Sequence, residues 1–496
     1  MVHHWNHKMR FFFNTIILLG SFILLPLFVS ACADSMLETG MIVNAKVKAV
    51  SMKTDQSDEM ETSNIKMIRM AEMLPDNFVP SDDNIVSTPD STLPIYVFFE
   101  NGEDAGVLYF YTEDDRIVMN PNSSYIFSGI PSLTDISGLA NWDSSNAVSL
   151  VGAFSGDSSL SDIVPLSKWD TSSLLYAERM FKDDSALVNI TALANWNTSN
   201  VKNMSGMFSN ARSLTDALAL RDWDTSNVTD MSFMFSRAIS LMFVDVSNWN
   251  TSKVTTMANM FQVGDSWKGN GQLVEIIGLG KLDVSSVTDM TCMFYGAGQM
   301  TSYDIAEWNV SKVESMNHMF GDNLRLRSLD LSGWNVSSLK TIYCMFDDNR
   351  KLKTIGDVSH WNTANLIDAG AWLNDSRSFV GDDNGMLDLS GWDTSNLKSA
   401  GEMFLYTNLR TIDLSGWTFD SITNDMWEEA GKGIYYETGN DLEPLRGLGS
   451  MFKASSELIT VYISQAGLDS YNAAVERGVN ILDMWNNTRT GGFTVK

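Results

Sequence analysis

The stretch Leu329–Phe346 reads Leu-Asp-Leu-Ser-Gly-Trp-Asn-Val-Ser-Ser-Leu-Lys-Thr-Ile-Tyr-Cys-Met-Phe, and much of the chain repeats it in varied form. Its tryptophan recurs as Trp142, Trp169, Trp196, Trp223, Trp249, Trp308, Trp334, Trp361, Trp392 and Trp417, with Leu282 in its place once. The steps between these positions range from 25 to 33 residues. A fixed period of this kind is typical of solenoids and propellers, and a propeller blade needs four strands and about 40 residues. The period therefore favours a solenoid.

One distance inside the repeat is constant. In nine repeats a phenylalanine follows the tryptophan, or Leu282, by 12 residues, as Phe346 follows Trp334. The repeat of Trp361 has Trp372-Leu373 instead. Length varies only between the phenylalanine and the next repeat, where loops grow at low cost. We therefore expect the segment from tryptophan to phenylalanine to be tightly packed.

The two halves of the repeat have different patterns. The first half predicts a strand, because Leu329, Leu331 and Trp334 fit L-x-x-L-x-L-x-x-N with tryptophan in the asparagine position. The second half predicts a short helix, since inward positions recur at helical spacing, as in Val228, Met231, Met234 and Phe235. An extra residue in several units, as at 190–193, suggests bulges. The expected fold is an α/β repeat solenoid, leucine-rich-repeat-like, with about 11 strand–turn–short-helix units of 25–33 residues between two caps.

The wording of the repeat resembles a known family. The units Leu-Ser-Gly-Trp-Asp-Thr-Ser-Asn-Leu at 389–397 and Trp-Asp-Thr-Ser-Asn-Val-Thr-Asp-Met-Ser-Phe-Met-Phe at 223–235 are similar to the repeats of BspA-type bacterial surface proteins. The resemblance covers about 131–455 and departs from the pattern at Leu282 and in the unit of Trp361. It implies a secreted or membrane-anchored leucine-rich-repeat protein associated with adhesion and with binding host or neighbouring-cell components.

The N-terminus has the pattern of a secretory signal. Lys8 and Arg10 precede the apolar run 11–29, which predicts a signal peptide over 1–31. Val29-Ser30-Ala31-Cys32 resembles a bacterial lipobox, in which the cysteine becomes the lipidated N-terminus, so Cys32 is the expected lipid attachment. An ordinary signal-peptidase site near Ala31 and a retained membrane anchor are the alternatives. All three place the remaining chain outside the cytoplasm, on the lipid-anchored cell surface or the outer membrane.

The rest of the chain divides by composition. The polar, acidic stretch 32–91 predicts a flexible tether, and 92–130 predicts a β-rich N-terminal cap with a hairpin around Asn101-Gly102. The solenoid is expected over 131–455 and a C-terminal cap over 456–496, with an amphipathic helix at 467–482.

Charge and motif content exclude several function classes. Acidic residues outnumber basic ones by 61 to 34, giving a net charge of −27, which argues against nucleic acid as a partner. No phosphate-binding loop, nucleophile elbow or H-E-x-x-H motif is present, and we predict no cofactor, no metal site and no catalytic residue. Cys292 and Cys344 lie two repeats apart, roughly 10 Å if the repeats stack at strand spacing. Cysteines beyond about 7 Å between Cα atoms cannot be bridged, so both are expected as small buried residues.

One polar pattern stands out as a possible binding surface. The residue four before the tryptophan is an aspartate in consecutive repeats: Asp304, Asp330, Asp357, Asp388 and Asp413, with Asp245 earlier in the chain. Between inward-facing strand positions such a residue points to the sheet face that solenoids use for binding. This strip fits a basic segment or divalent ions, or it is a solvated repeat residue without a ligand. The long insert after Trp417 adds possible loop anchors, Trp427, Tyr435 and Tyr436.

These observations predict a cell-surface lipoprotein that acts as a non-catalytic protein-binding or adhesion scaffold. Its partners would be an extracellular, host or neighbour-cell protein and, through the anchor, the lipid membrane. The alternative is an envelope-associated enzyme or carbohydrate-binding protein with its site in the long inserts, which predicts a concave pocket there. A purely structural envelope protein is a third possibility and predicts no saturable ligand.

Overall fold

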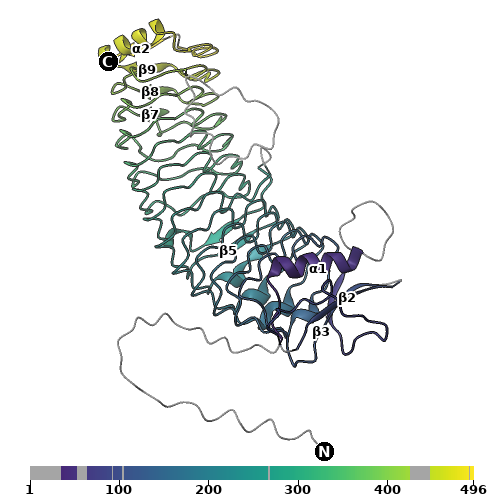
Figure 1. Cartoon of the computed structure of the whole chain (residues 1–496). Helices are drawn as coiled ribbons and strands as arrows, with labels where there is room; N and C mark the ends of the chain where they lie inside the picture. The colour runs from purple at the N-terminus through teal and green to yellow at the C-terminus, as the bar shows by residue number, and fades with distance from the viewer. Residues whose placement is uncertain are drawn as a thin grey trace, which may run out of the picture.

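The computed structural model describes residues 35–52, 64–91, 93–102, 105–265, 269–424, 447–490 and 492–496. Figure 1 shows a long, curved stack of similar turns of chain, each of which we call a rung. The helix α1 and the strands β2 and β3 lie at one end of the stack, and α2 lies at the other. The stacked repeats that the sequence predicts are therefore present.

A ladder of parallel backbone bonds joins consecutive rungs along the turn segment, defined here as the 14 residues after each tryptophan. The residue seven positions after the tryptophan bridges to its equivalent in the next rung. These bridges connect, in order, Asn122, Ser149, Tyr176, Asn203, Asp230, Thr256, Asp289, Ser315, Thr341, Asp368 and Ser399. Beyond this residue the N–H groups alternate in their use. In one rung Met231, Phe233, Phe235 and Arg237 donate to carbonyls of the next rung, whereas the N–H groups between them donate three residues back.

The turn segment is not the short helix that its apolar spacing predicts, and that prediction was wrong. In every rung from Trp142 to Trp392 the tenth residue after the tryptophan, or Leu282, has a positive φ, as in Phe233 at 59° and His318 at 52°. A non-glycine residue in this left-handed region costs about 1–2 kcal/mol and ends a helix. Bonds that donate three residues back keep right-handed turns between these residues, so the inward positions still recur at helical spacing.

The tryptophans and phenylalanines explain the constant distance of 12 residues. The phenylalanine rings of successive rungs stack, with centroids 5.8 Å apart between Phe181 and Phe208 and 5.7 Å apart between Phe208 and Phe235. The indole Nε1 of Trp223 donates to the carbonyl of Leu193 in the preceding rung at 2.9 Å. Equivalent bonds are made by Trp169, Trp196, Trp249, Trp308, Trp334, Trp361, Trp392 and Trp417. Each tryptophan thus supplies a donor from the position that the pattern assigns to asparagine.

The residues that follow the tryptophan form a hydrogen-bonded corner. Asp224 accepts the N–H of Ser226 at 3.0 Å, so it closes a local turn. Thr225 donates its hydroxyl to the next rung, at the carbonyl of Asn250, and Asn227 donates its amide to the preceding rung, at the carbonyl of Ser199. The sequence Asp-Thr-Ser-Asn therefore joins three rungs.

The return segments, which lead from one turn segment to the next tryptophan, vary in structure. One parallel sheet contains β4 (Asp216–Ala217), β5 (Phe243–Asp245) and β6 (Glu275–Ile277), and a second contains β7 (Met386–Asp388), β8 (Thr411–Asp413), β9 (Thr460–Ile463) and β10 (Thr494–Val495). Short 3-10 helices occur at η1 (Ser137–Leu139), η2 (Val164–Lys168), η3 (Thr191–Leu193), η4 (Leu218–Leu220) and η5 (Leu279–Lys281). The strand prediction holds only in part, and the bulge predicted at 190–193 is the helix η3.

The N-terminal cap is larger than the sequence suggested, since the tether predicted for 32–91 is folded over 35–52 and 64–91. The helix α1 (Gly40–Met52) covers the first rung and buries Val43 and Val47. A Cβ on Gly40 would lie 2.3 Å from the carbonyl oxygen of Ser124, so glycine permits this close approach. The strand β1 (Met67–Met70) pairs in parallel with β3 (Ala105–Tyr111), which forms the expected hairpin with β2 (Tyr96–Gly102).

At the other end, α2 (Gln465–Glu476) follows β9, and the hydroxyl of Ser464 accepts the N–H of Gly467 as an N-cap. The expected helix at 467–482 thus begins earlier and is shorter. Cys292 and Cys344 are buried free thiols, as predicted. Among the described residues, no helix has the length and apolar character needed to cross a membrane.

Candidate functional site

The aspartates of the predicted strip shape local turns. Asp330 accepts the N–H of Ser332 at 3.1 Å and also its hydroxyl. The same backbone bond, to the N–H two residues on, is made by Asp245, Asp357, Asp388 and Asp413. Asp304 is exposed and has no hydrogen bond to another described residue. The serine hydroxyl lowers the pKa of Asp330 and of Asp357, which keeps both charged.

The strip is not uniform along the stack. Asp388 and Asp413 are paired in register on β7 and β8. Asp413 is 1% exposed and forms an ion pair with Lys496. Burial raises its pKa, but the hydrogen bonds from Lys496 and Ser415 outweigh burial and leave the pKa below its ordinary value. The partner of Asp245 in register is Ile277, so the acidic column is interrupted there.

Sequence reasoning missed a continuation of these turns toward the N-terminus. In the first rungs the residue seven before the tryptophan caps the N–H two positions on: Asp135, Asp162, Asn189 and Asp216. These rungs carry one more residue before the tryptophan and form 3-10 helices, which moves the cap. The signal in the sequence is an Asp or Asn at a constant distance from these tryptophans.

An open groove of about 1490 Å³ lies beside β7, where the long return after Trp372 joins the strip. Its lining includes Asp357 and Asp388 of the strip, Asp382 and Asp383 of the insert, and the basic residues Lys353 and Arg410. Asp382 accepts the N–H groups of Asn384 and Met386, both at 2.8 Å, so it closes the turn of the insert. The groove therefore presents both signs of charge, which the strip alone did not predict.

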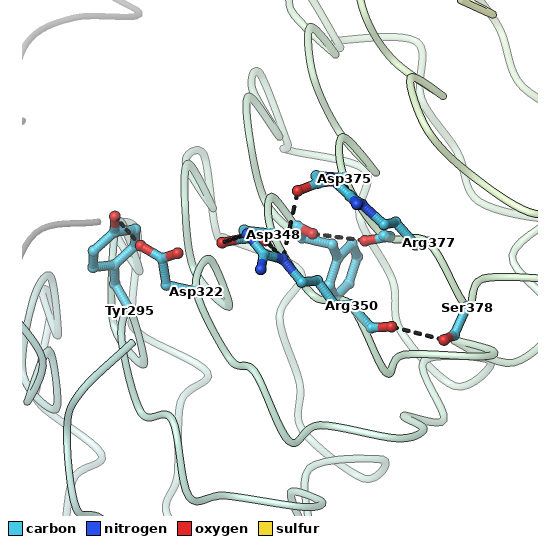
Figure 2. A network of polar contacts seen from close by, with 9 residues as sticks. Tyr295, Asp322, Asp348, Arg350, Asp375, Arg377 and Ser378 are labelled. Carbon is cyan, nitrogen blue, oxygen red and sulfur yellow. Dashed lines mark hydrogen bonds and ion pairs between the residues drawn. The ribbon is translucent and has the colours of Figure 1, made fainter. Parts of the chain in front are cut away.

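A second polar group lies on the turn segments of neighbouring rungs (Figure 2). Asp348 accepts from Nε of Arg350 at 2.5 Å, and the same nitrogen lies 3.5 Å from Asp375. Asp375 in turn accepts from Nε of Arg377 at 2.5 Å. Each arginine follows its aspartate by two residues, and the two pairs are one repeat apart, a sequence signal that our reasoning did not use.

Buried carboxyls adjoin this network. The hydroxyl of Tyr295 donates to Asp322, yet burial raises the pKa of Asp322 to about 6. Burial also raises the pKa of Asp347 well above its ordinary value, and the charge of Asp322 adds to the effect. Perturbed carboxyls often mark functional sites, although structural networks perturb them too. In the part of the chain that the structure describes, no three His, Cys, Asp or Glu residues are placed to hold a metal ion.

The remaining candidates do not form a site. Cys292, His318 and Cys344 occupy the same position in consecutive rungs and are buried. Burial lowers the pKa of His318 to about 4 and raises the pKa of both thiols, so all three are neutral near pH 7. The predicted lipid attachment and loop anchors lie outside the described residues: Cys32, Trp427, Tyr435 and Tyr436.

Comparisons with known proteins place the repeats in a family. The family model described as "Mycoplasma protein of unknown function, DUF285" matches residues 121–212, 184–276, 269–386 and 356–433. No curated protein matches the sequence.

Solved structures give distant matches. An internalin (inlF) from Listeria monocytogenes is 11% identical over 68% of this chain and 75% of its own, with a TM-score of 0.22. The functional domain of InlJ from Listeria monocytogenes is 13% identical over 67% of this chain, with a TM-score of 0.21. A chain of the TLR13–ssRNA13 complex is 13% identical over 70% of this chain, also with a TM-score of 0.21. This chain covers 61% of the InlJ domain and 48% of the TLR13 complex chain.

Proposed function

The chain belongs to the family described as "Mycoplasma protein of unknown function, DUF285", and from this premise we propose that it is a non-catalytic protein-binding scaffold displayed on the cell surface. The resemblance of its repeats to BspA-type surface proteins supports this proposal. So does the stack itself, because stacked repeats create extended binding surfaces.

The observation that carries the proposal is the use of the strip carboxylates. Each of Asp330, Asp357 and Asp388 accepts the N–H two residues on, and the three follow one another along the stack rather than converging on one point. A general acid needs a raised pKa and a position next to the reacting atom. The lowered pKa values of Asp330 and Asp357 favour charge recognition over proton transfer.

The groove indicates the chemistry of the partner. Asp357 and Asp388 favour basic side chains, whereas Lys353 and Arg410 in the same groove favour carboxylates. A protein segment with both charges satisfies both sets, whereas a nucleic acid would satisfy only the basic residues. The net charge of −27 adds long-range repulsion against a polyanion.

The surface location rests on the sequence. We propose that the signal peptide 1–31 is removed and that Cys32 is lipidated, which holds the folded part on the membrane. The cap begins at residue 35, only three positions after Cys32, so the stack would stand close to the lipid surface. Labelling with a radioactive or alkyne-bearing fatty acid tests this step, and Cys32→Ser should abolish the label.

Binding by the strip is tested with a triple variant. Asp330, Asp357 and Asp388 are changed to Asn, which keeps the oxygen that closes each turn and removes three charges. Asp170, Asp224 and Asp283, which close the corner turns in the same way, are changed to Asn as the matched control. The probe is the set of matrix and cell-surface proteins captured by the chain from Cys32 onward. The strip variant should bind at least about tenfold more weakly and with less salt dependence, and the control should bind normally. Equal binding by the two variants would end the proposal.

One observation favours the alternative of a carbohydrate-binding protein or an enzyme, because the groove lies at a long insert. Among the residues that line it there is no aromatic ring, histidine or cysteine. Stacking platforms and most nucleophiles or bases are therefore missing from its described lining. A glycan array screened with the whole chain tests this alternative, and saturable binding lost in Asp388→Asn would favour it.

A further inference from the structure

The two ends of the turn ladder differ in what they offer to another chain. In each rung four N–H groups at alternate positions donate to carbonyls of the next rung. In the last rung but one these donors are Leu448, Ser450, Phe452 and Ala454. Their acceptors are the carbonyls of Asn480, Leu482, Met484 and Asn486, at 2.9, 2.8, 3.1 and 2.7 Å. This end of the stack therefore points its backbone donors outward.

The final rung repeats the arrangement without a following rung. Its equivalent N–H groups belong to Ile481, Asp483, Trp485 and Asn487, and none has an acceptor among the described residues. The N–H groups between them are bonded inside the rung: those of Leu482, Met484, Asn486 and Thr488. Asp483 and Asn487 have φ values of 56° and 62°, the same left-handed conformation as in the earlier rungs. The row of donors is therefore formed in full.

The opposite end of the ladder is closed by the chain itself. At the first rung the N–H of Gly40 donates to the carbonyl of Asn122 at 2.9 Å. Asn44 and Lys48 on α1 donate to the carbonyl of Ser128 at 3.0 and 2.7 Å. Here side chains of α1 take the place of a preceding rung. A second copy stacked head to tail would have to displace this helix.

At the final rung, by contrast, α2 covers the return side. Ser470 accepts the N–H of Phe419, and Tyr471 packs edge-on against Phe419 and Phe493. The turn side remains open, and Leu482 on it is 71% exposed. Trp485 stacks on Phe452 with centroids 4.7 Å apart and is itself only partly buried. An apolar surface thus lies beside the four donors.

We propose that this end of the stack is a docking edge for an extended segment of another polypeptide, which adds one more rung. The carbonyls of that segment accept the N–H groups of Ile481, Asp483, Trp485 and Asn487. Two adjacent apolar side chains of the segment cover Leu482 and Trp485, as methionine and phenylalanine cover the equivalent positions inside the stack. Open backbone edges of this kind are used for strand addition, where main-chain bonds give affinity and apolar positions give specificity. This surface is separate from the groove and does not depend on its function.

The probe is a synthetic peptide of residues 227–237, Asn-Val-Thr-Asp-Met-Ser-Phe-Met-Phe-Ser-Arg, which has the repeat's own turn sequence. Residue-level amide exchange of the whole chain is measured with and without it. The amides of Ile481, Asp483, Trp485 and Asn487 should exchange at least about tenfold more slowly at saturation. The amides of Leu482, Met484 and Asn486 should not change. A peptide of scrambled order should give no protection.

Two variants separate docking from misfolding. Leu482→Glu places a charge on the apolar surface and should weaken binding about tenfold. Val79→Glu, at a residue 74% exposed on the other cap, is the matched control and should bind normally. The proposal is overturned if the four amides are already protected without peptide, or if saturating peptide leaves them unchanged. It is also overturned if Leu482→Glu binds normally, or if inorganic phosphate alone protects the same amides.

Discussion

The turn segment and the return segment of the same rung obey different rules. In the turn segment every inward side chain and every second N–H group contacts the neighbouring rung, so its length cannot change. In the return segment the same task is done by a strand at β5 and by a 3-10 helix at η3. The difference teaches that constancy in the sequence reports contact between rungs, whereas the return segments are free to carry recognition.

The largest test of this comparison is a deletion in each segment. Phe208 is fully buried between two stacked rings, and Phe208→Ala should cost about 3–5 kcal/mol of unfolding free energy. Leu218, in the return segment, is 43% exposed, and Leu218→Ala should change stability by about 0.5 kcal/mol or less. Urea unfolding followed by tryptophan fluorescence measures both. Similar losses in the two variants would contradict the division into scaffold and free surface.

The indole hydrogen bond gives the next largest effect. Trp223→Phe keeps the buried ring but leaves the carbonyl of Leu193 without its donor, which should cost about 1–3 kcal/mol. Trp142 provides a natural control, because its indole nitrogen has no partner among the described residues. Trp142→Phe should therefore cost clearly less in the same unfolding measurement. An equal cost would assign the effect to packing alone.

How far the sequence could predict the structure follows the same division. The stack, the hairpin and the packing of tryptophan against phenylalanine were predictable because they depend on apolar residues at fixed spacing. The helix was wrongly predicted because left-handed residues such as Arg179, Phe233 and His318 are not glycines, so nothing in their identity marks the break. Side-chain spacing alone cannot distinguish a helix from turns that donate three residues back.

The candidate site was predicted less well than the fold. The acidic column was visible because its members stand at one distance from the tryptophan. The basic side of the groove was not, since Lys353 and Arg410 meet it only after the insert folds. The tether was wrongly assigned because 35–52 buries few residues of its own and gains its core only against the first rung. These features depend on contacts between distant parts of the chain.

A buried position in the turn segment makes a test with the sign of a pH dependence. Asp184, fifteen residues after Trp169, is fully buried, and burial raises its pKa well above the ordinary value. Its Oδ1 accepts the N–H of Asp157 at 2.9 Å, whereas Oδ2 has no partner among the described residues. The equivalent Asn349 donates its amide to the carbonyl of Phe320 at 2.8 Å. Asp184→Asn should therefore stabilise the protein at pH 7 by on the order of 1 kcal/mol.

The pH profile identifies the cause of this gain. A carboxyl with a raised folded pKa contributes its full stability below the unfolded pKa of about 4 and loses it as the pH rises through the folded pKa. The advantage of Asp184→Asn should accordingly vanish near pH 3 and grow toward neutral pH. Asn349→Asp should show the reverse, with a loss at pH 7 that acid restores. A gain independent of pH would point to packing instead of ionisation.

The smallest expected effect belongs to the return segment, at the acidic strip. Asp330→Ala removes the acceptor for the N–H of Ser332 and should cost about 0.5–1 kcal/mol, whereas Asp330→Asn keeps an acceptor and should cost less. The serine hydroxyl lowers the folded pKa of Asp330, so its contribution is present above the unfolded pKa and is lost as the pH falls through the folded one. Solvent screens this exposed carboxylate, which keeps the effect small. Thermal unfolding at pH 7 and pH 3 measures the difference between wild type and Asp330→Ala. If that difference persists at pH 3, the aspartate shapes the turn without its charge, and the strip is free to serve a ligand.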